Sequence, residues 1–323
     1  MTSSVLTLPT SDDVTAARSN IRGFAVRTPL LKLSADLPGI NVYLKLENLQ
    51  PLGSFKIRPG VNVLKSMDPG RLQRGVLTAS AGNFGQGLVF AAREIGVPAT
   101  VVVPEGSAET KAKALAGLGA KVIRLPFDEW WTVLTTRRFA GEEGVFVHPV
   151  AESAVIAGNA TIAAEIIEDQ TDIDAVVVPF GGGGLACGIG SVMRRSRPGV
   201  RMIVAESEAA QPAAAALAHG RPVRVPHIQS FVDGMGSTTV LEEMWPLIRE
   251  MVDGAACASF AQIAEAIRLL AGRHHVIAEA AGAASVAVAM AGQAGEGNIV
   301  CIISGGNIDP SKLGAILNGQ SPI

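Results

Sequence analysis

The sequence predicts an α/β protein of two lobes, each an open parallel sheet with helices on both faces. Short runs rich in Val and Ile alternate with helical patterns along most of the 323 residues, and this alternation is typical of strands lying in a parallel sheet between covering helices. The length suits about two domains. Glycine-rich turns follow several of the apolar runs, at the strand ends where open α/β sheets bind their ligands.

Each element follows from a local pattern. Short apolar runs beside Gly or Pro predict buried strands, and the longer segments between them predict helices. The predicted strands are residues 42–46, 75–79, 99–103, 121–125, 175–178, 201–205 and 298–303. The predicted helices are residues 83–95, 108–118, 156–167, 185–195, 260–271 and 280–291.

The alternation of strands and helices between residues 75 and 149 is self-contained, which predicts a small domain of residues 73–148. Residues 1–72 and 149–323 would then form a large domain together. The sequence shows no internal repeat and no low-complexity linker.

Composition excludes several classes of protein. With 48% hydrophobic and 17% charged residues, the chain is too apolar to be disordered. A net charge of −2 and an aromatic content of 4% argue against a nucleic-acid partner. Three dispersed cysteines (Cys187, Cys257, Cys301), no signal peptide and no apolar run of about 20 residues predict a reduced, cytoplasmic protein that binds no membrane.

Lys56 lies in the segment PLGSFKIR, after a Gly-Ser turn and at the start of a predicted helix. One interpretation is an ordinary solvated lysine. The other is an amine held at a helix N-terminus, where the positive potential favours its uncharged, nucleophilic form. The residues alone leave both open.

Two further turns are candidates for binding sites. In TASAGNFGQG, a strand ends and a helix begins, so the free N–H groups suit a carboxylate or phosphate, although Ser80 acting as a simple helix cap explains the pattern equally well. In IISGGN, a buried strand ends at Ser304 and two glycines, and a plain tight turn is the alternative.

The four consecutive glycines Gly181–Gly184 are the strongest signal. They stand between a buried strand and a helix, and the backbone entropy they cost favours an anion-binding loop over a purely structural one. The same loop satisfies the dinucleotide fingerprint, with Ala186 at its last position and Glu206 after the next strand, so the pattern alone does not separate NAD from a smaller phosphate ligand.

In combination and order, these four segments resemble the pyridoxal-phosphate-dependent serine/threonine dehydratase (threonine ammonia-lyase) and serine racemase family, which has the tryptophan-synthase-β-like fold, fold type II. The motifs RTPL, LKLEN, VIAG, VDG and AEAAGA, which begin at residues 27, 44, 155, 232 and 278, extend the resemblance over nearly the whole chain.

The resemblance implies that the large domain binds pyridoxal 5'-phosphate. Lys56 would form the Schiff base, Phe55 would pack on the ring, Asn83 would bind the phenolic oxygen and Ser304 would meet the pyridine nitrogen. The residues implied to hold the phosphate are Gly181, Gly182, Gly183, Gly184 and Leu185. Glycines 82, 85, 87, 305 and 306 are likewise expected where the backbone approaches a ligand.

For the substrate, the resemblance implies an amino acid whose carboxylate is received by Ser80, Ala81, Gly82 and Asn83. The expected reaction is α,β-elimination of water from threonine, serine or a related 3-hydroxy amino acid, giving a 2-oxo acid and ammonia. Lys56 would remove the α-proton. A neutral serine at the ring nitrogen makes the cofactor a weaker electron sink, which favours prompt elimination.

Three departures from the family pattern sharpen this expectation. Ala81 replaces the second serine of racemases, which disfavours racemisation. Phe84 replaces a histidine and leaves the identity of the substrate open. Pro212 stands where several members have a metal-binding aspartate after Glu206, so no metal is expected.

Racemisation or β-replacement on the same fold remains an alternative, and a nicotinamide-dependent oxidoreductase is an alternative of another class. The resemblance also implies a homodimer.

Overall fold

The computed structural model describes residues 6–80, 82–107 and 109–320. It divides into two compact units. Unit 1 comprises Met1–Val26 and Lys56–Thr161, and unit 2 comprises Arg27–Phe55 and Ile162–Ile323.

The predicted small domain, residues 73–148, lies wholly within unit 1. Unit 1 is larger than this prediction, because it also takes in segments that were predicted to belong to the large domain. The predicted limits at 72/73 and 148/149 therefore stay a prediction, which limited proteolysis can test.

In the described residues, unit 2 is built on a six-stranded sheet. Its strands, in spatial order, are β1 (Leu30–Lys32), β2 (Ile40–Lys45), β10 (Gly297–Ile302), β7 (Ala175–Pro179), β8 (Arg201–Ser207) and β9 (Gly254–Ala258). Neighbouring strands run parallel except at the edge, where β1 pairs antiparallel with β2. β7 is buried along its whole length, which explains its continuous apolar sequence AVVVP.

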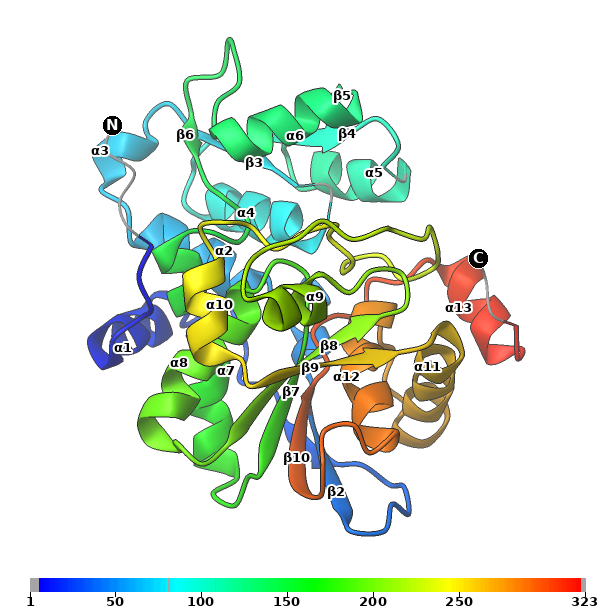
Figure 1. The fold of residues 1–323 in the computed structure, drawn as a ribbon. Coiled ribbons are helices and arrows are strands. Elements are labelled where there is room, and N and C mark those ends of the chain that lie inside the picture. Colours follow the sequence, from blue (N-terminus) through cyan, green and yellow to red (C-terminus); the bar gives the residue numbers. More distant parts are fainter. Residues whose placement is uncertain (1–5, 81, 108, 321–323) are drawn as a thin grey trace. The chain divides into compact units, whose positions relative to one another are not determined.

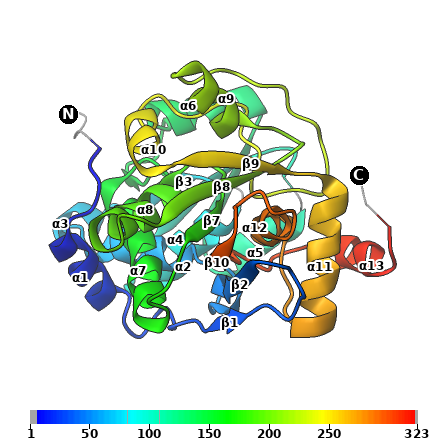
Figure 2. The same cartoon turned by 60° about the horizontal axis from the view of Figure 1, so that its bottom comes forward.

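Helices cover both faces of this sheet (Figure 2). α8 (Gly184–Ser196) packs on β7 and β8 from one side, and α12 (Ala280–Met290) packs from the other. α12 is buried on every side, since its sequence AAGAASVAVAM is apolar all round. The other helices of the unit are η1 (Glu47–Leu49), α9 (Pro212–His219), α10 (Trp245–Met251), α11 (Phe260–His274) and α13 (Pro310–Leu317). α7 (Ser153–Asp169) begins in unit 1 and ends in unit 2.

A buried polar cluster lies at the end of β2 in unit 2. The fully buried Lys45 donates hydrogen bonds to Glu165 Oε2 (2.6 Å) and to the carbonyl oxygen of Thr28 (2.7 Å). Thr28 Oγ1 in turn donates to Glu47 Oε1 (2.6 Å), and Gln50 Nε2 donates to Glu47 Oε2 (3.1 Å). Partnered in this way, the charges tolerate burial. The cluster fixes the chain just before the loop that leads to Lys56.

Within the residues described for unit 1, a four-stranded parallel sheet has the order β5 (Lys121–Leu125), β4 (Ala99–Pro104), β3 (Val76–Ala79) and β6 (Val145–Phe146). Helices α4 (Asn83–Glu94) and α6 (Phe127–Thr136) lie on opposite faces of this sheet (Figure 1). The remaining helices are α1 (Ser11–Asn20), α2 (Ile57–Lys65), α3 (Pro69–Leu72) and α5 (Glu109–Gly117).

The predicted fold class is confirmed. Every predicted strand is present to within two residues at its ends, and every predicted helix to within three. Strands β1, β6 and β9 were not predicted. β6 is two residues long, and β9 has the sequence GAACA, which lacks the β-branched residues that mark a strand. None of the described helices is both long and apolar enough to cross a membrane.

Candidate active site

Lys56 lies at the N-cap of α2, as predicted. α2 packs against α4 at closest range beside this residue: a Cβ on Gly87 would lie 2.3 Å from the carbonyl oxygen of Lys56. A Cβ on Gly60 would lie 2.6 Å from the backbone of Gly87. Because Gly60 and Gly87 have no side chains, α4 packs directly against the main chain of Lys56. Helix packing, not the expected approach to a ligand, explains Gly87.

The side chain of Lys56 extends over an aromatic ring. Its Nζ lies 5.6 Å from the ring centroid of Phe84, and the ring itself is buried. An ammonium group over an aromatic face is attracted by the ring quadrupole, by about 0.5–2 kcal/mol. Phe84, which stands where the resemblance leads one to expect a histidine, thus places a buried aromatic ring next to the amine of Lys56.

The turn between β3 and α4 carries the predicted carboxylate site. α4 begins at Asn83, and its N-cap is Gly82, which makes no side-chain capping bond. The alternative of Ser80 as the helix cap is therefore wrong. A Cβ on Gly85 would lie 2.6 Å from the carbonyl oxygen of Ser80, so this glycine also serves the packing of the protein itself. Ala81 lies outside the described residues.

His148 is a residue of this region that was not predicted from the sequence. It follows β6, is 2% exposed, and its Nδ1 accepts hydrogen bonds from the N–H groups of Val150 (3.1 Å) and Ala151 (2.8 Å). Burial, then the charges of Arg137 and Lys56, lower the pKa of His148 to about 3. The available signal was a lone histidine directly after an apolar strand of a parallel sheet.

In unit 2, the glycine loop forms an open set of donors. α8 begins at Gly184 after Gly183, whose φ is +89°. In the described part of the chain, the N–H groups from Gly181 to Ala186 donate to no acceptor. Ser237 Oγ fixes the loop by donating to the carbonyl oxygen of Gly181 (2.8 Å). Consecutive free N–H groups at a helix N-terminus bind phosphate.

The segment before Lys56 is fastened to the turn after β10. The N–H of Phe55 donates to the carbonyl oxygen of Ser304 (3.0 Å), and the N–H of Gly306 donates to the carbonyl oxygen of Gly53 (2.8 Å). Asn307 Nδ2 adds a bond to the carbonyl oxygen of Leu52 (2.9 Å). The predicted Phe55 and Ser304 are thus brought together within unit 2. Since Lys56 is the next residue after Phe55, the same bonds set where the lysine leaves this unit.

Two glycines allow close packing around the Ser304 turn. A Cβ on Gly282 would lie 2.9 Å from the carbonyl oxygen of Gly305, so the start of α12 approaches the turn closely. A Cβ on Gly306 would lie 2.5 Å from the carbonyl oxygen of Ile277. Protein packing therefore explains Gly306, for which a ligand contact was expected.

The carboxylate of Glu206 is occupied by the protein. It accepts hydrogen bonds from the N–H groups of Ala213 (2.7 Å) and Ala214 (2.9 Å) at the start of α9, while burial raises its pKa. Among the described residues, no three His, Cys, Asp or Glu side chains are grouped so as to hold a metal ion. A metal-free enzyme stays a prediction.

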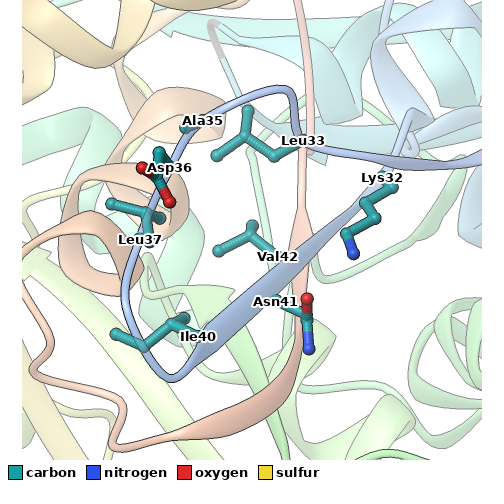
Figure 3. A pocket seen from close by; sticks show the side chains of 8 residues that line it. All are labelled: Lys32, Leu33, Ala35, Asp36, Leu37, Ile40, Asn41 and Val42. Atoms are coloured by element: carbon teal, nitrogen blue, oxygen red, sulfur yellow. The ribbon is translucent and has the colours of Figure 1, made fainter.

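A separate hollow of about 210 Å³ lies beside the turn between β1 and β2 (Figure 3). Leu33, Leu37 and Val42 form its apolar part, and Lys32, Asp36 and Asn41 lie around it. It contains none of the predicted site residues, and we assign it no role.

Comparison with known proteins identifies the family of this chain. A family model described as pyridoxal-phosphate dependent enzyme matches residues 21–305. The L-threonine ammonia-lyase of Thermotoga maritima is 37% identical over 315 residues, which cover 96% of this chain and 78% of that protein. Maize serine racemase has a TM-score of 0.87 at 26% identity, covering 95% of this chain and 96% of that chain. The processed form of threonine deaminase isoform 2 from Solanum lycopersicum has a TM-score of 0.83 at 29% identity, covering 97% of this chain and 90% of that chain.

The residues present fit the cofactor in the family's name. Among the described residues, six adjacent N–H groups without a protein acceptor suit a phosphate. Ser304 offers a neutral hydroxyl on a buried residue, and Lys56 offers a primary amine at a helix N-terminus. With the family model covering most of its length and these groups in place, the chain belongs to the pyridoxal-phosphate-dependent enzymes.

Proposed function

We propose that this protein is an ammonia-lyase that removes water from a β-hydroxy amino acid, namely threonine, serine or a related 3-hydroxy amino acid, and yields a 2-oxo acid and ammonia. The observation that carries the proposal is the 37% identity with an L-threonine ammonia-lyase over 96% of the chain. Lys56 and the free N–H groups of the glycine loop support it, since the chemistry needs an amine and a phosphate anchor.

The residues take the following roles in this proposal. Lys56 is the point of covalent attachment of the cofactor, Asn83 binds the phenolic oxygen and Ser304 meets the pyridine nitrogen. Phe55 packs on the ring. The phosphate is held by backbone N–H groups, those of Gly181, Gly182, Gly183, Gly184 and Leu185. The carboxylate of the amino acid is received at the turn of Ser80, Ala81, Gly82 and Asn83.

When bound, the cofactor withdraws electrons from Cα of the amino acid and makes the α-proton acidic. Lys56 Nζ takes that proton, and the Phe84 ring below it stabilises the ammonium that results. The bond between Cβ and oxygen then breaks while the Lys56 ammonium returns its proton to the hydroxyl oxygen, so the hydroxyl leaves as water and Lys56 regains its free amine. The released enamine reacts with water to give the 2-oxo acid and ammonia. Ser304 carries no charge and so does not hold a proton on the ring nitrogen.

The test supplies purified enzyme with a panel of 3-hydroxy amino acids and measures 2-oxo acid and ammonia. In parallel, borohydride reduction and peptide mapping locate the bound cofactor. We expect equal amounts of the two products and a pyridoxyl label on the peptide that contains Lys56. A labelled enzyme that forms no 2-oxo acid from any of these substrates would overturn the lyase proposal.

Amino-acid racemisation is the second candidate, because maize serine racemase is similar over 95% of the chain. Ala81, where racemases have a second serine, argues for elimination. Chiral chromatography of the same reactions decides between them: accumulation of the D-enantiomer faster than 2-oxo acid would favour the racemase.

We also propose that the enzyme is a homodimer of the cytoplasm, as the resemblance to the family implies. Light scattering during gel filtration tests the dimer, and fractionation of the source cells tests the location. A monomeric mass or a membrane-bound fraction would contradict the respective part.

A further inference from the structure

His148 lies at the carboxyl end of β6, directly beside the end of β3. The N–H of Val147 donates to the carbonyl oxygen of Leu77 (2.7 Å), and Thr78 Oγ1 donates to the carbonyl oxygen of Val147 (2.8 Å). The next residue, His148, is therefore level with the last residues of β3, and β3 leads into the turn at Ser80 where a substrate carboxylate is expected. Its place in the fold is that of a ligand-binding residue of a parallel sheet.

The hydrogen bonds of His148 fix its tautomer. Two backbone N–H groups, of Val150 and Ala151, point at Nδ1. Nδ1 must therefore be the acceptor nitrogen, and in the neutral ring Nε2 carries the hydrogen. Burial, then the charges of Arg137 and Lys56, lower the pKa of His148, so the ring is neutral as this tautomer requires.

The donor that results is unused by the protein. Nε2 has no hydrogen-bond partner among the described residues, although only 2% of the residue is exposed. An imidazole N–H that no described protein group accepts, on a residue this deeply placed, is available to a ligand at the end of the sheet. The charge of Lys56 also acts on the ring.

The loop that holds His148 is itself held at a strained residue. Arg137, the C-cap of α6, has a left-handed backbone with φ +59°, which a non-glycine residue rarely adopts. From there its Nη2 donates to the carbonyl oxygen of Ala151 (3.0 Å), the residue whose N–H binds His148 Nδ1. Ala151 is thus bound through its carbonyl oxygen to Arg137 and through its N–H to His148. These two bonds fix the loop and the orientation of the imidazole ring.

We propose that His148 is a substrate-binding residue whose Nε2–H donates a hydrogen bond to an oxygen of the bound amino acid, either the carboxylate or the β-hydroxyl. The ring stays neutral and transfers no proton. This inference rests on the proposed lyase function and adds to it a residue that selects for an oxygen-bearing substrate.

Two substitutions separate the two nitrogens of the ring. His148→Asn keeps an acceptor at the position of Nδ1, so the loop bonds survive, but it removes the donor. His148→Gln reaches the position of Nε2 with an amide donor, but it gives up the acceptor. His219→Asn, on the exposed end of α9, is the matched control.

We expect His148→Asn to lower kcat/KM by about 10- to 100-fold and to weaken the substrate Kd, measured from the substrate-induced absorbance change, by a similar factor. The Tm of the cofactor-free protein should stay near wild type. His148→Gln should recover most of the lost kcat/KM while lowering Tm, and His219→Asn should change neither quantity.

An analogue without the β-hydroxyl identifies the oxygen. If His148→Asn weakens the binding of L-2-aminobutyrate as much as that of the substrate, the bond goes to the carboxylate, and if only the hydroxylated substrate is affected, it goes to the hydroxyl. Wild-type kcat/KM and Kd in His148→Asn, together with a low Tm and low activity in His148→Gln, would overturn the inference and leave His148 a loop-holding residue. Failure of the lyase proposal is distinct, since the wild-type enzyme would then form no 2-oxo acid.

Discussion

The predicted site residues of the two units differ in kind. In unit 2 the glycine cradle, defined as Gly181–Leu185, is built from backbone N–H groups held by Ser237. In unit 1 the lysine set, defined as Lys56, Asn83, Phe84 and His148, is built from side chains at the start of α2, at the start of α4 and after β6. The first set offers main-chain N–H groups, and the second offers the side chains of an amine, an amide, an aromatic ring and an imidazole.

This difference separates binding from chemistry. The glycine cradle binds through main-chain N–H groups, so a substitution there changes its shape and not its charge. In the lysine set a substitution also removes a side chain with a chemical property of its own. We therefore expect substitutions in the glycine cradle to act on cofactor affinity, and substitution of Lys56 to act on turnover.

The largest effect is expected at Lys56. Lys56→Ala removes the amine that takes the α-proton, so kcat should fall by at least about 1000-fold, within the range of lost acid–base catalysis. Steady-state kinetics at saturating cofactor measure it. Lys65→Ala, at the other end of α2, is the control and should retain wild-type kcat. Substantial turnover in Lys56→Ala would contradict the assignment.

Gly183→Ala tests the cradle. The residue has φ +89°, and an added Cβ would lie 2.6 Å from Ile248 Cδ1, so the loop must shift. We expect cofactor Kd to rise about tenfold or more, in line with the roughly 1–2 kcal/mol of left-handed strain, while kcat at saturating cofactor changes little. Fluorescence titration of the cofactor-free protein measures Kd. Gly199→Ala, where a Cβ meets open space, should behave as wild type. A lower kcat with normal Kd would break the proposed division between the units.

A smaller effect concerns acid stability. Because the pKa of His148 is about 3 when folded and near 6.5 when unfolded, the unfolded chain takes up a proton that the folded chain does not, and stability is lost as pH falls below 6.5. The slope approaches about 1.4 kcal/mol per pH unit. In urea unfolding, His148→Asn should lose about 2 kcal/mol less than wild type between pH 7 and pH 5. Parallel profiles would show that the ring titrates normally.

The smallest effect is expected at the turn after β10. Asn307→Ala removes the bond to the carbonyl oxygen of Leu52 and should cost about 0.5–1.5 kcal/mol of unfolding free energy, seen as a small fall in Tm. Because this bond holds the segment before Lys56, kcat should fall a few-fold. The exposed Asn318, substituted by Ala, serves for comparison. An unchanged kcat would mean that the backbone bonds of Phe55 and Gly306 suffice to place the lysine.

Much of the fold was predictable because buried parallel strands are continuous apolar runs, as in AVVVP at β7. The elements that were missed are those whose pattern is weak: GAACA at β9, and the antiparallel edge strand β1, of which only Leu30 is partly buried. Their formation depends on tertiary pairing rather than on local preference.

The residues of the candidate site also differ in how far the sequence could predict them. Lys56 and Gly183 occupy the local settings that the sequence predicts, a helix N-cap in each case. For Gly87 and Gly306 a ligand contact was expected. A close approach of distant backbone explains why both are glycine, and a linear sequence does not show such an approach. For His148 the sequence offers only a lone histidine after an apolar strand; its tautomer depends on hydrogen bonds made only after the loop folds.

The cradle has one more consequence. Amide N–H groups do not ionise in the physiological range, so the loop that we propose anchors the cofactor phosphate has no titration of its own. The pH dependence of phosphate binding should therefore follow the ionisation of the phosphate ester alone, with a midpoint near its second pKa of about 6.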